Sequence, residues 1–151
     1  MTLARALFDL IVSGIATAGF GLLFRTERRA LLPGALLGGA GYVVYDALLV
    51  LTGSAPLSAL LGGLTAGLGA EIAARVQKSP AIVYATMGVI PLVPGYGLYR
   101  TMEFMVQADY VQALGAGMET ALVAGAIALS LGAATVFARN LFRLPLFRRA
   151  S

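Results

Sequence analysis

Five long apolar segments, separated by short polar connections, make up most of the chain. They cover residues 6–24, 30–51, 57–76, 81–106 and 111–138. An α-helix needs about 20 predominantly apolar residues to cross the hydrocarbon core of a membrane, and each segment is about that long or longer. Polar and turn-forming residues fill the connections, as loops at a membrane surface require. The pattern predicts an all-α integral membrane protein, a bundle of about five transmembrane helices in one domain over residues 1–151.

The fourth segment is interrupted in its middle by the sequence Ile90-Pro91-Leu92-Val93-Pro94-Gly95. Each proline lacks the N–H that would bond the carbonyl four residues earlier, so a regular helix cannot continue through this stretch. Non-helical backbone at membrane depth is tolerated only where it is packed in protein or lines a polar cavity. We therefore expect a broken helix at Pro91–Gly95 and a substrate path beside it. A proline kink without a ligand is the alternative.

Composition agrees with a membrane protein. Of the 151 residues, 59% are hydrophobic and 12% are charged, against roughly 25% charged in an ordinary soluble domain. The chain contains neither cysteine nor histidine, so disulfides, thiolate chemistry and the usual zinc or haem ligands are excluded, and no metal or cofactor is expected. The net charge of +4 does not indicate nucleic-acid binding, because the basic residues lie at the ends of apolar segments.

Lysine and arginine are distributed unevenly between the two ends of the five segments. With five crossings, one side receives Arg25, Arg28, Arg29, Arg75, Lys78, Arg139, Arg143, Arg148 and Arg149. The other side receives only Arg5. Because cytoplasmic loops carry the excess of positive charge, we expect the N-terminus outside and a basic cytoplasmic tail over residues 139–151. A re-entrant fourth segment would place this tail opposite the other basic loops, which the charge rule disfavours.

Two features of the segments have an alternative interpretation. Small residues four apart, Gly34–Gly38 and Gly63–Gly67, and a stripe on the fifth segment predict close helix packing. That stripe consists of Gly117, Ala121, Gly125 and Ala128. A specific dimerisation face or a pathway lined by backbone is the alternative.

The first segment could instead be a cleaved signal peptide, because Ala16-Thr17-Ala18 resembles a cleavage site, although only Arg5 precedes it.

Charged residues within the apolar segments are the candidate functional groups, because a charge at the bilayer centre costs at least about 2.5 kcal/mol. Glu71 and Arg75, one helical turn apart, are expected to form a structural pair. Asp9 lies near the end of a segment, and Glu27 lies in a connection among arginines. Four others are deeper: Asp46, Arg100, Glu103 and Glu119. A rise of 1.5 Å per residue places Asp46, Arg100 and Glu119 at depths of about 8, 10 and 12 Å.

These buried charges predict either transport chemistry or a structural cluster. Asp46, Glu103 and Glu119 are candidates for proton or ion coupling, since an intramembrane acid can take up and release a proton. Glu103 is one turn from Arg100 and could pair with it, whereas Asp46 and Glu119 must find Arg100, a hydroxyl, water or a partner chain. The structural alternative is an ion-pair cluster that joins the second, fourth and fifth segments.

The break itself offers a binding site for a carboxylate. After Pro94 and Gly95 a second half-helix begins, and its first N–H groups and dipole favour negative charge. Arg100 would add a fixed charge, and Tyr96 and Tyr99 would add hydroxyls and aromatic walls. Together with Pro91, these residues form the predicted substrate site.

Several motifs resemble the threonine/serine exporter family. They are Gly19-Phe20-Gly21 with Phe24, Arg29-Ala30-Leu31, the glycine-rich run at 35–41, and above all Ile90-Pro91-Leu92-Val93-Pro94-Gly95 with Tyr99. The resemblance covers about residues 10–140 and matches the second half of that family. It implies a small, separately encoded half that works with a larger membrane partner. It also implies export of threonine and serine or of dicarboxylates such as succinate, and no assigned site residues follow from it.

We therefore expect a secondary transporter subunit in a bacterial plasma membrane that exports a small carboxylate with a larger exporter half. No phosphate-binding Gly-x-x-x-x-Gly-Lys-[Ser/Thr] motif is present, which leaves an ion, proton or substrate gradient as the energy source. The alternatives are a structural subunit that only stabilises its partner and a homo-oligomeric channel. An enzyme is not expected, because the serine hydroxyls have no visible base nearby.

Overall fold

The computed structural model describes the backbone of residues 3–143 and the side chains of residues 3–140. The chain is all-helical over this part. Its elements are α1 (Leu3–Leu23), α2 (Arg28–Thr52), α3 (Ala55–Gln77), α4 (Ala81–Val89), the 3₁₀ turn η1 (Ile90–Leu92), α5 (Gly95–Val106) and α6 (Tyr110–Arg143). These bounds match the predicted segments to within a few residues, apart from the C-terminal end of α6. The all-α fold class is confirmed.

Four helices, α1, α2, α3 and α6, are each long and apolar enough to cross a membrane. The predicted fourth segment is divided into two pieces, Ala81–Leu92 and Gly95–Val106, which meet at an angle of 49°. If this bent pair counts as one span, the described chain holds five. The break therefore lies at the prolines, where the missing N–H groups predicted it.

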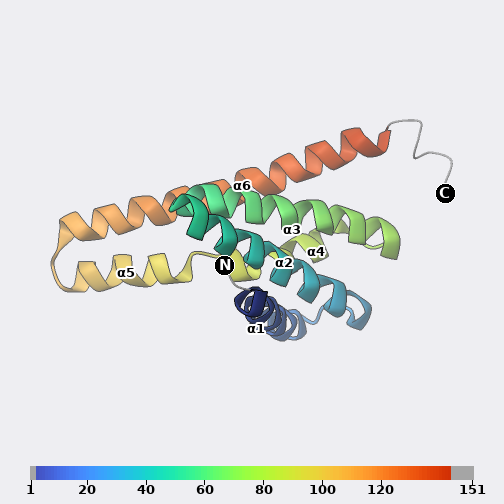
Figure 1. Ribbon diagram of the computed structural model, residues 1–151, viewed down its shortest axis with the longest axis horizontal. Coiled ribbons are helices and arrows are strands. Elements are labelled where there is room, and N and C mark those ends of the chain that lie inside the picture. Colours follow the sequence, from blue (N-terminus) through green and yellow to red (C-terminus); the bar gives the residue numbers. More distant parts are fainter. Residues whose placement is uncertain (1–2, 144–151) are drawn as a thin grey trace.

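The helices pack as a bundle from which α5 and the first part of α6 project as a hairpin (Figure 1). Helix α3 lies between α2 and α6 and also packs on α4, while α1 packs mainly on α2. Helix α5 packs mainly on α6 and buries none of its own residues. The half-helix after the break is thus covered by this chain on one side only.

Small residues allow these close contacts. A Cβ atom on Gly34 would clash with the side chain of Met87, and one on Gly67 would lie 2.7 Å from Cβ of Ala134. Gly38 packs against Thr17, and Gly63 against Ser130. The predicted packing role of these four glycines is confirmed.

The small stripe on α6 is arranged differently. Gly117 faces Thr101 of α5, but Ala121, Gly125 and Ala128 are exposed on this chain. This part of the stripe therefore does not pack within the described bundle.

The basic connections lie together. Arg25 of the α1–α2 connection and Ser79 of the α3–α4 connection line one cavity, and Arg139 lines another with Glu71 and Ala81. Figure 1 shows the C-terminal ends of α3 and α6 at the same end of the bundle. The side chains of Arg143, Arg148 and Arg149 lie outside the described residues.

Glu71 forms the predicted pair with Arg75. The Arg75 Nη1 atom donates to Oε2 of Glu71 at 2.7 Å and to the Glu71 carbonyl oxygen at 2.6 Å. Because the Glu71 carboxylate is largely buried, this bond neutralises a charge that would otherwise be costly.

Candidate functional site

A cavity of about 470 Å³ lies beside the broken span. Its wall is formed by the break and the start of α5, by α2 and by α6. The lining residues that carry polar groups or shape the break are Tyr42, Tyr45, Pro91, Pro94, Gly95, Tyr96, Arg100, Glu119 and Thr120. Six of the predicted site residues, namely Pro91, Pro94, Gly95, Tyr96, Arg100 and Glu119, therefore line one cavity.

The backbone at the break is bonded by a tighter turn. The carbonyl oxygen of Met87 accepts from the N–H of Ile90, and that of Ile90 accepts from the N–H of Val93 at 3.3 Å. These bonds span three residues, so the 3₁₀ turn η1 satisfies the two carbonyls that the prolines leave without their helical donors. These two carbonyls are therefore bonded within the protein and do not face lipid unpaired.

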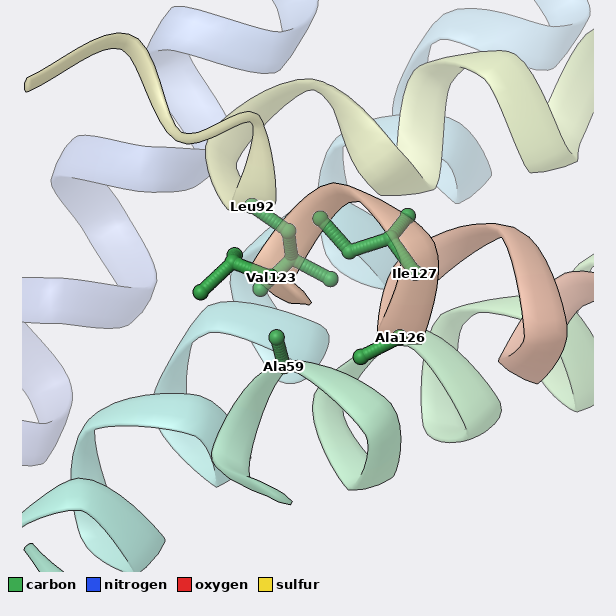
Figure 2. Close-up of a cluster of buried hydrophobic side chains, with 5 residues drawn as sticks. All are labelled: Ala59, Leu92, Val123, Ala126 and Ile127. Carbon is green, nitrogen blue, oxygen red and sulfur yellow. The ribbon is translucent and has the colours of Figure 1, made fainter. Parts of the chain in front are cut away.

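Leu92 fixes the break to the bundle. Its side chain is 4% exposed and packs in a cluster with Ala59 of α3 and Val123, Ala126 and Ile127 of α6. Figure 2 shows Leu92 extending from η1 toward these side chains. Leu92 thus anchors the break, and Pro91 and Pro94 line the cavity together with it.

Helix α5 begins at the cavity wall. The Gly95 N–H donates to the Val93 carbonyl oxygen at 2.7 Å, and the Leu98 N–H donates to the Pro94 carbonyl oxygen at 3.1 Å. The intervening N–H groups of Tyr96 and Gly97 belong to the first turn, which has no intrahelical acceptors. This end of α5 can therefore donate to an anion in the cavity, as the sequence predicts.

Arg100 is held by aromatic rings. Its guanidinium carbon lies 4.9 Å from the ring centre of Phe104 and 6.0 Å from that of Tyr96. Both contacts are cation–π interactions, which orient the guanidinium without neutralising it. Among the residues whose side chains are described, no carboxylate lies within 4.0 Å of Arg100. The predicted pairing of Arg100 with Glu103 therefore does not occur here.

Glu119 shares two cavities with Arg100. Besides the main cavity, both residues line a neighbouring one of about 490 Å³ with Phe104, Asp109 and Gln112. On α6, the next residue, Thr120, packs against Gly97 of α5 and bonds its hydroxyl to the Ala116 carbonyl oxygen. A positive and a negative side chain thus border the same space without forming an ion pair.

Two predicted site residues lie elsewhere on α5. Tyr99 and Glu103 line a separate cavity of about 280 Å³ with Met102, Val106 and Gln107. The helical spacing accounts for this placement, because residues 99 and 103 are four apart and share a face. Tyr96 and Arg100 share a neighbouring face on which the main cavity opens.

Asp46 pairs with a residue that the sequence did not suggest. The Arg5 Nη2 atom donates to Oδ1 of Asp46 at 2.9 Å. The expectation that Asp46 must find Arg100, a hydroxyl, water or a partner chain was therefore wrong, as was the alternative of a cluster with Arg100 and Glu119. The packing of α1 on α2 brings Arg5 beside Asp46 across 41 positions, which no local pattern shows.

Sequence reasoning also missed Tyr42 and Tyr45, which line the cavity from α2 with ring centres 5.9 Å apart. One signal was available: Tyr42 lies one turn before Asp46, on a helix that is otherwise apolar and glycine-rich.

Within the described residues, no three His, Cys, Asp or Glu side chains gather as a metal site would require.

The family described as "Threonine/Serine exporter, ThrE" matches residues 9–137, which include the cavity, the break and the paired half-helices. The chain belongs to the threonine/serine exporter family. Membership of this family supports a transporter role, and the candidate membrane spans described above support a multi-pass membrane protein. No solved structure is significantly similar to this chain.

Two curated relatives are similar over most of this chain. A threonine/serine exporter from Corynebacterium glutamicum is 30% identical over 145 residues, which cover 91% of this chain and 28% of the relative. An uncharacterized protein from Haemophilus influenzae is 26% identical over 136 residues, which cover 84% of this chain and 46% of the relative. The chain therefore spans less than half the length of either relative.

Proposed function

We propose that this chain is a subunit of a secondary transporter that exports a small amino acid, threonine or serine, across the bacterial plasma membrane. A larger membrane partner would complete the transporter. The observation that carries this proposal is the cavity at the Pro91–Pro94 break. The first turn of α5, Arg100 and Glu119 all line it. The orientation follows the charge rule, with the N-terminus outside and the C-terminus in the cytoplasm.

The two charges of the cavity favour an amino acid over a dicarboxylate. Arg100 and the first N–H groups of α5 suit one carboxylate group. Glu119 suits an ammonium group and would repel a second carboxylate. Threonine and serine carry one carboxylate and one ammonium group, whereas a dicarboxylate such as succinate would meet Glu119 with its second negative group. The tyrosine hydroxyls and Thr120 are available for the substrate hydroxyl.

The outer face of α5 supports the need for a partner. Arg100 and Glu119 are both exposed on this chain, and α5 buries no residue. Charged groups that face lipid at membrane depth cost at least about 2.5 kcal/mol each, so a protein surface is expected there. The curated relatives are more than twice as long as the region that matches. We infer that a larger exporter half covers α5, and that lipid covers the apolar outer faces of α1 and α2.

The coupling step is assigned first to Glu119, because it lines the substrate cavity. An acid at this place can hold a proton or the ammonium group of the substrate but not both, which links the two movements. Asp46 lies outside this cavity beside Arg5, and Glu103 lines a different cavity. Of the three predicted coupling acids, Glu119 is the one that lines the proposed substrate cavity.

Reconstitution with the larger half in threonine-loaded vesicles tests this function. We expect threonine efflux that is lowered about tenfold or more by Arg100→Gln, since a hydrogen bond to a charged group contributes about 1.5–3 kcal/mol. Arg139→Gln, at the other end of α6, is the matched control and should leave efflux unchanged. Succinate-loaded vesicles should show little efflux. Equal efflux from wild-type and Arg100→Gln vesicles would rule out the proposed site.

Two other functions give different results in the same vesicles. If the chain only assembles the transporter, Arg100→Ala lowers the amount of complex but leaves substrate selectivity unchanged. If it forms a homo-oligomeric channel, for which the exposed Ala121, Gly125 and Ala128 stripe offers a packing face, efflux occurs without the larger half. Membership of a family of exporters also argues against an enzymatic function of this chain.

A further inference from the structure

Apart from the charges of the substrate cavity, a cluster of three charged residues lies where α1 packs on α2. The Arg5 guanidinium bridges two acids: its Nη2 atom bonds Oδ1 of Asp46 at 2.9 Å, and its Nε atom lies 3.9 Å from Oδ2 of Asp9. We call these three residues the Asp9–Arg5–Asp46 cluster. With both acids ionised it carries one net negative charge.

Asp46 is buried, Asp9 is half-buried, and both carboxylates are incompletely bonded. The side chains of Asp46 and Asp9 are 10% and 16% exposed, whereas that of Arg5 is 55% exposed. Oδ2 of Asp46 and Oδ2 of Asp9 are shielded from solvent and accept no hydrogen bond from the described residues. A buried carboxylate oxygen without a donor is costly, and one arginine cannot neutralise two carboxylates.

We propose that the Asp9–Arg5–Asp46 cluster binds one proton and releases it during the transport cycle. Uptake of a proton makes the cluster neutral, which removes the unpaired buried charge. Release leaves Arg5 shared between two carboxylates. This inference rests on the proposed function only for the transport cycle; the binding of the proton stands on the geometry of the cluster.

Few other charged or titratable groups face the cluster. Tyr42 on α2 lies within electrostatic reach of Asp9, Asp46 and Arg5. On α3, Glu71 and Arg75 bond each other near the opposite end of that helix. The sequences of α4 and η1 contain no acidic or basic residue. On α6, Glu119 lies within electrostatic reach of Tyr45, the residue before Asp46.

The cluster is open toward one membrane side. Asp46 lies six residues before the end of α2, a distance of about 9 Å, and Arg5 lies in the first turns of α1. This end of the bundle is opposite to the basic connections, and the charge rule assigns it to the outside. A proton that drives export must enter from the outside, so the exposed Arg5 side is the suitable entrance.

Two tyrosines connect the cluster to the substrate cavity. Tyr42 and Tyr45 line the cavity and lie one turn and one residue before Asp46. Tyr45 is within electrostatic reach of both Asp46 and Glu119. A change of charge at Asp46 therefore acts electrostatically on both tyrosines of the cavity wall.

Infrared spectroscopy of the protein in lipid bilayers tests proton binding without transport. All proteins compared carry Glu119→Gln, so that the acid of the substrate cavity contributes no band. As the pH is varied, the otherwise wild-type protein should show a carbonyl band of a protonated carboxylic acid that disappears on deprotonation. Asp46→Asn and Asp9→Asn should each remove this band, and Glu71→Gln, which removes a paired acid elsewhere, should keep it. Identical bands in the otherwise wild-type protein and both aspartate variants would overturn the proposal. The use of two variants allows for one that fails to fold.

Efflux from vesicles with the larger half tests the link to transport. A pH gradient of about one unit, acid outside, corresponds to about 1.36 kcal/mol per proton, or up to about tenfold in threonine gradient. We expect this stimulation in wild type and Glu71→Gln and its loss in Asp46→Asn and Asp9→Asn. Stimulation that persists in both, or that requires sodium, would contradict the inference. Absence of any wild-type efflux would instead reject the proposed function, while the infrared result still decides the cluster.

Discussion

The backbones of Gly41 and Gly62 approach so closely that a Cβ atom on Gly62 would lie 2.8 Å from the Gly41 carbonyl oxygen. The same Cβ atom would lie 3.1 Å from Cβ of Tyr45 and 3.3 Å from a methyl group of Leu92. This contact between α2 and α3 therefore sets the position of one cavity wall and of the break together. Both the tyrosine wall and η1 depend on the absence of a side chain at residue 62.

Gly62→Ala is expected to destabilise the bundle by about 1–3 kcal/mol, because the added methyl group meets rigid backbone. Gly132→Ala is the control, since a Cβ atom there meets no atom within 4 Å. Loss of folded protein on heating in detergent measures the difference. Equal thermal stability of the two variants would show that α2 and α3 are not packed as described.

The double variant Pro91→Ala/Pro94→Ala should straighten the broken span and lower efflux by at least about tenfold. Each proline disfavours a helix interior by about 3 kcal/mol, so both replacements favour a continuous helix that carries Arg100 away from the cavity. Pro56→Ala, at the start of α3 where proline is tolerated, should have no effect. Vesicle efflux measures both variants, and unchanged efflux in the double variant would separate the break from function.

Glu119→Gln and Glu103→Gln should differ, because only Glu119 lines the cavity that holds Arg100. We expect Glu119→Gln to abolish the dependence of threonine efflux on a pH gradient and Glu103→Gln to leave it unchanged. Rates measured at several external pH values distinguish the two. If proton-coupled efflux were the same in Glu119→Gln as in wild type, the coupling role of Glu119 would be wrong.

Glu71→Gln should cost about 1 kcal/mol of stability and leave efflux unchanged, because the pair with the partly exposed Arg75 is structural. Glu27→Gln is the comparison, since Glu27 pairs with Arg29 at an exposed position and should contribute nothing measurable. Thermal unfolding in detergent measures both changes. A large loss of transport in Glu71→Gln would place this pair in the mechanism.

The absence of cysteine allows the orientation to be tested with single introduced thiols. An impermeant thiol reagent added outside cells should label Ser54→Cys and Gln107→Cys but not Thr26→Cys or Ser79→Cys. Gln107 follows α5, so its labelling decides whether the bent pair crosses the membrane. Protection of Gln107→Cys would mean that the fourth segment returns to its starting side.

The sequence by itself determined the membrane class, the limits of the helices and the break. Each depends on local chemistry. A run of about 20 apolar residues is long enough to cross the hydrocarbon core, and Pro91 and Pro94 cannot continue a regular helix whatever surrounds them. The pairing of Glu71 with Arg75 was also predictable, since the two residues are one turn apart on one helix.

Only the tertiary structure decided which charges meet. Asp46 and Arg5 are 41 positions apart, and the packing of α1 on α2 brings them together, so no spacing in the chain could predict their bond. The rotation of α5 about its axis likewise placed Arg100 on the cavity and Glu103 away from it. Local sequence fixes where a helix starts and breaks, but the direction that each face takes depends on contacts with distant residues.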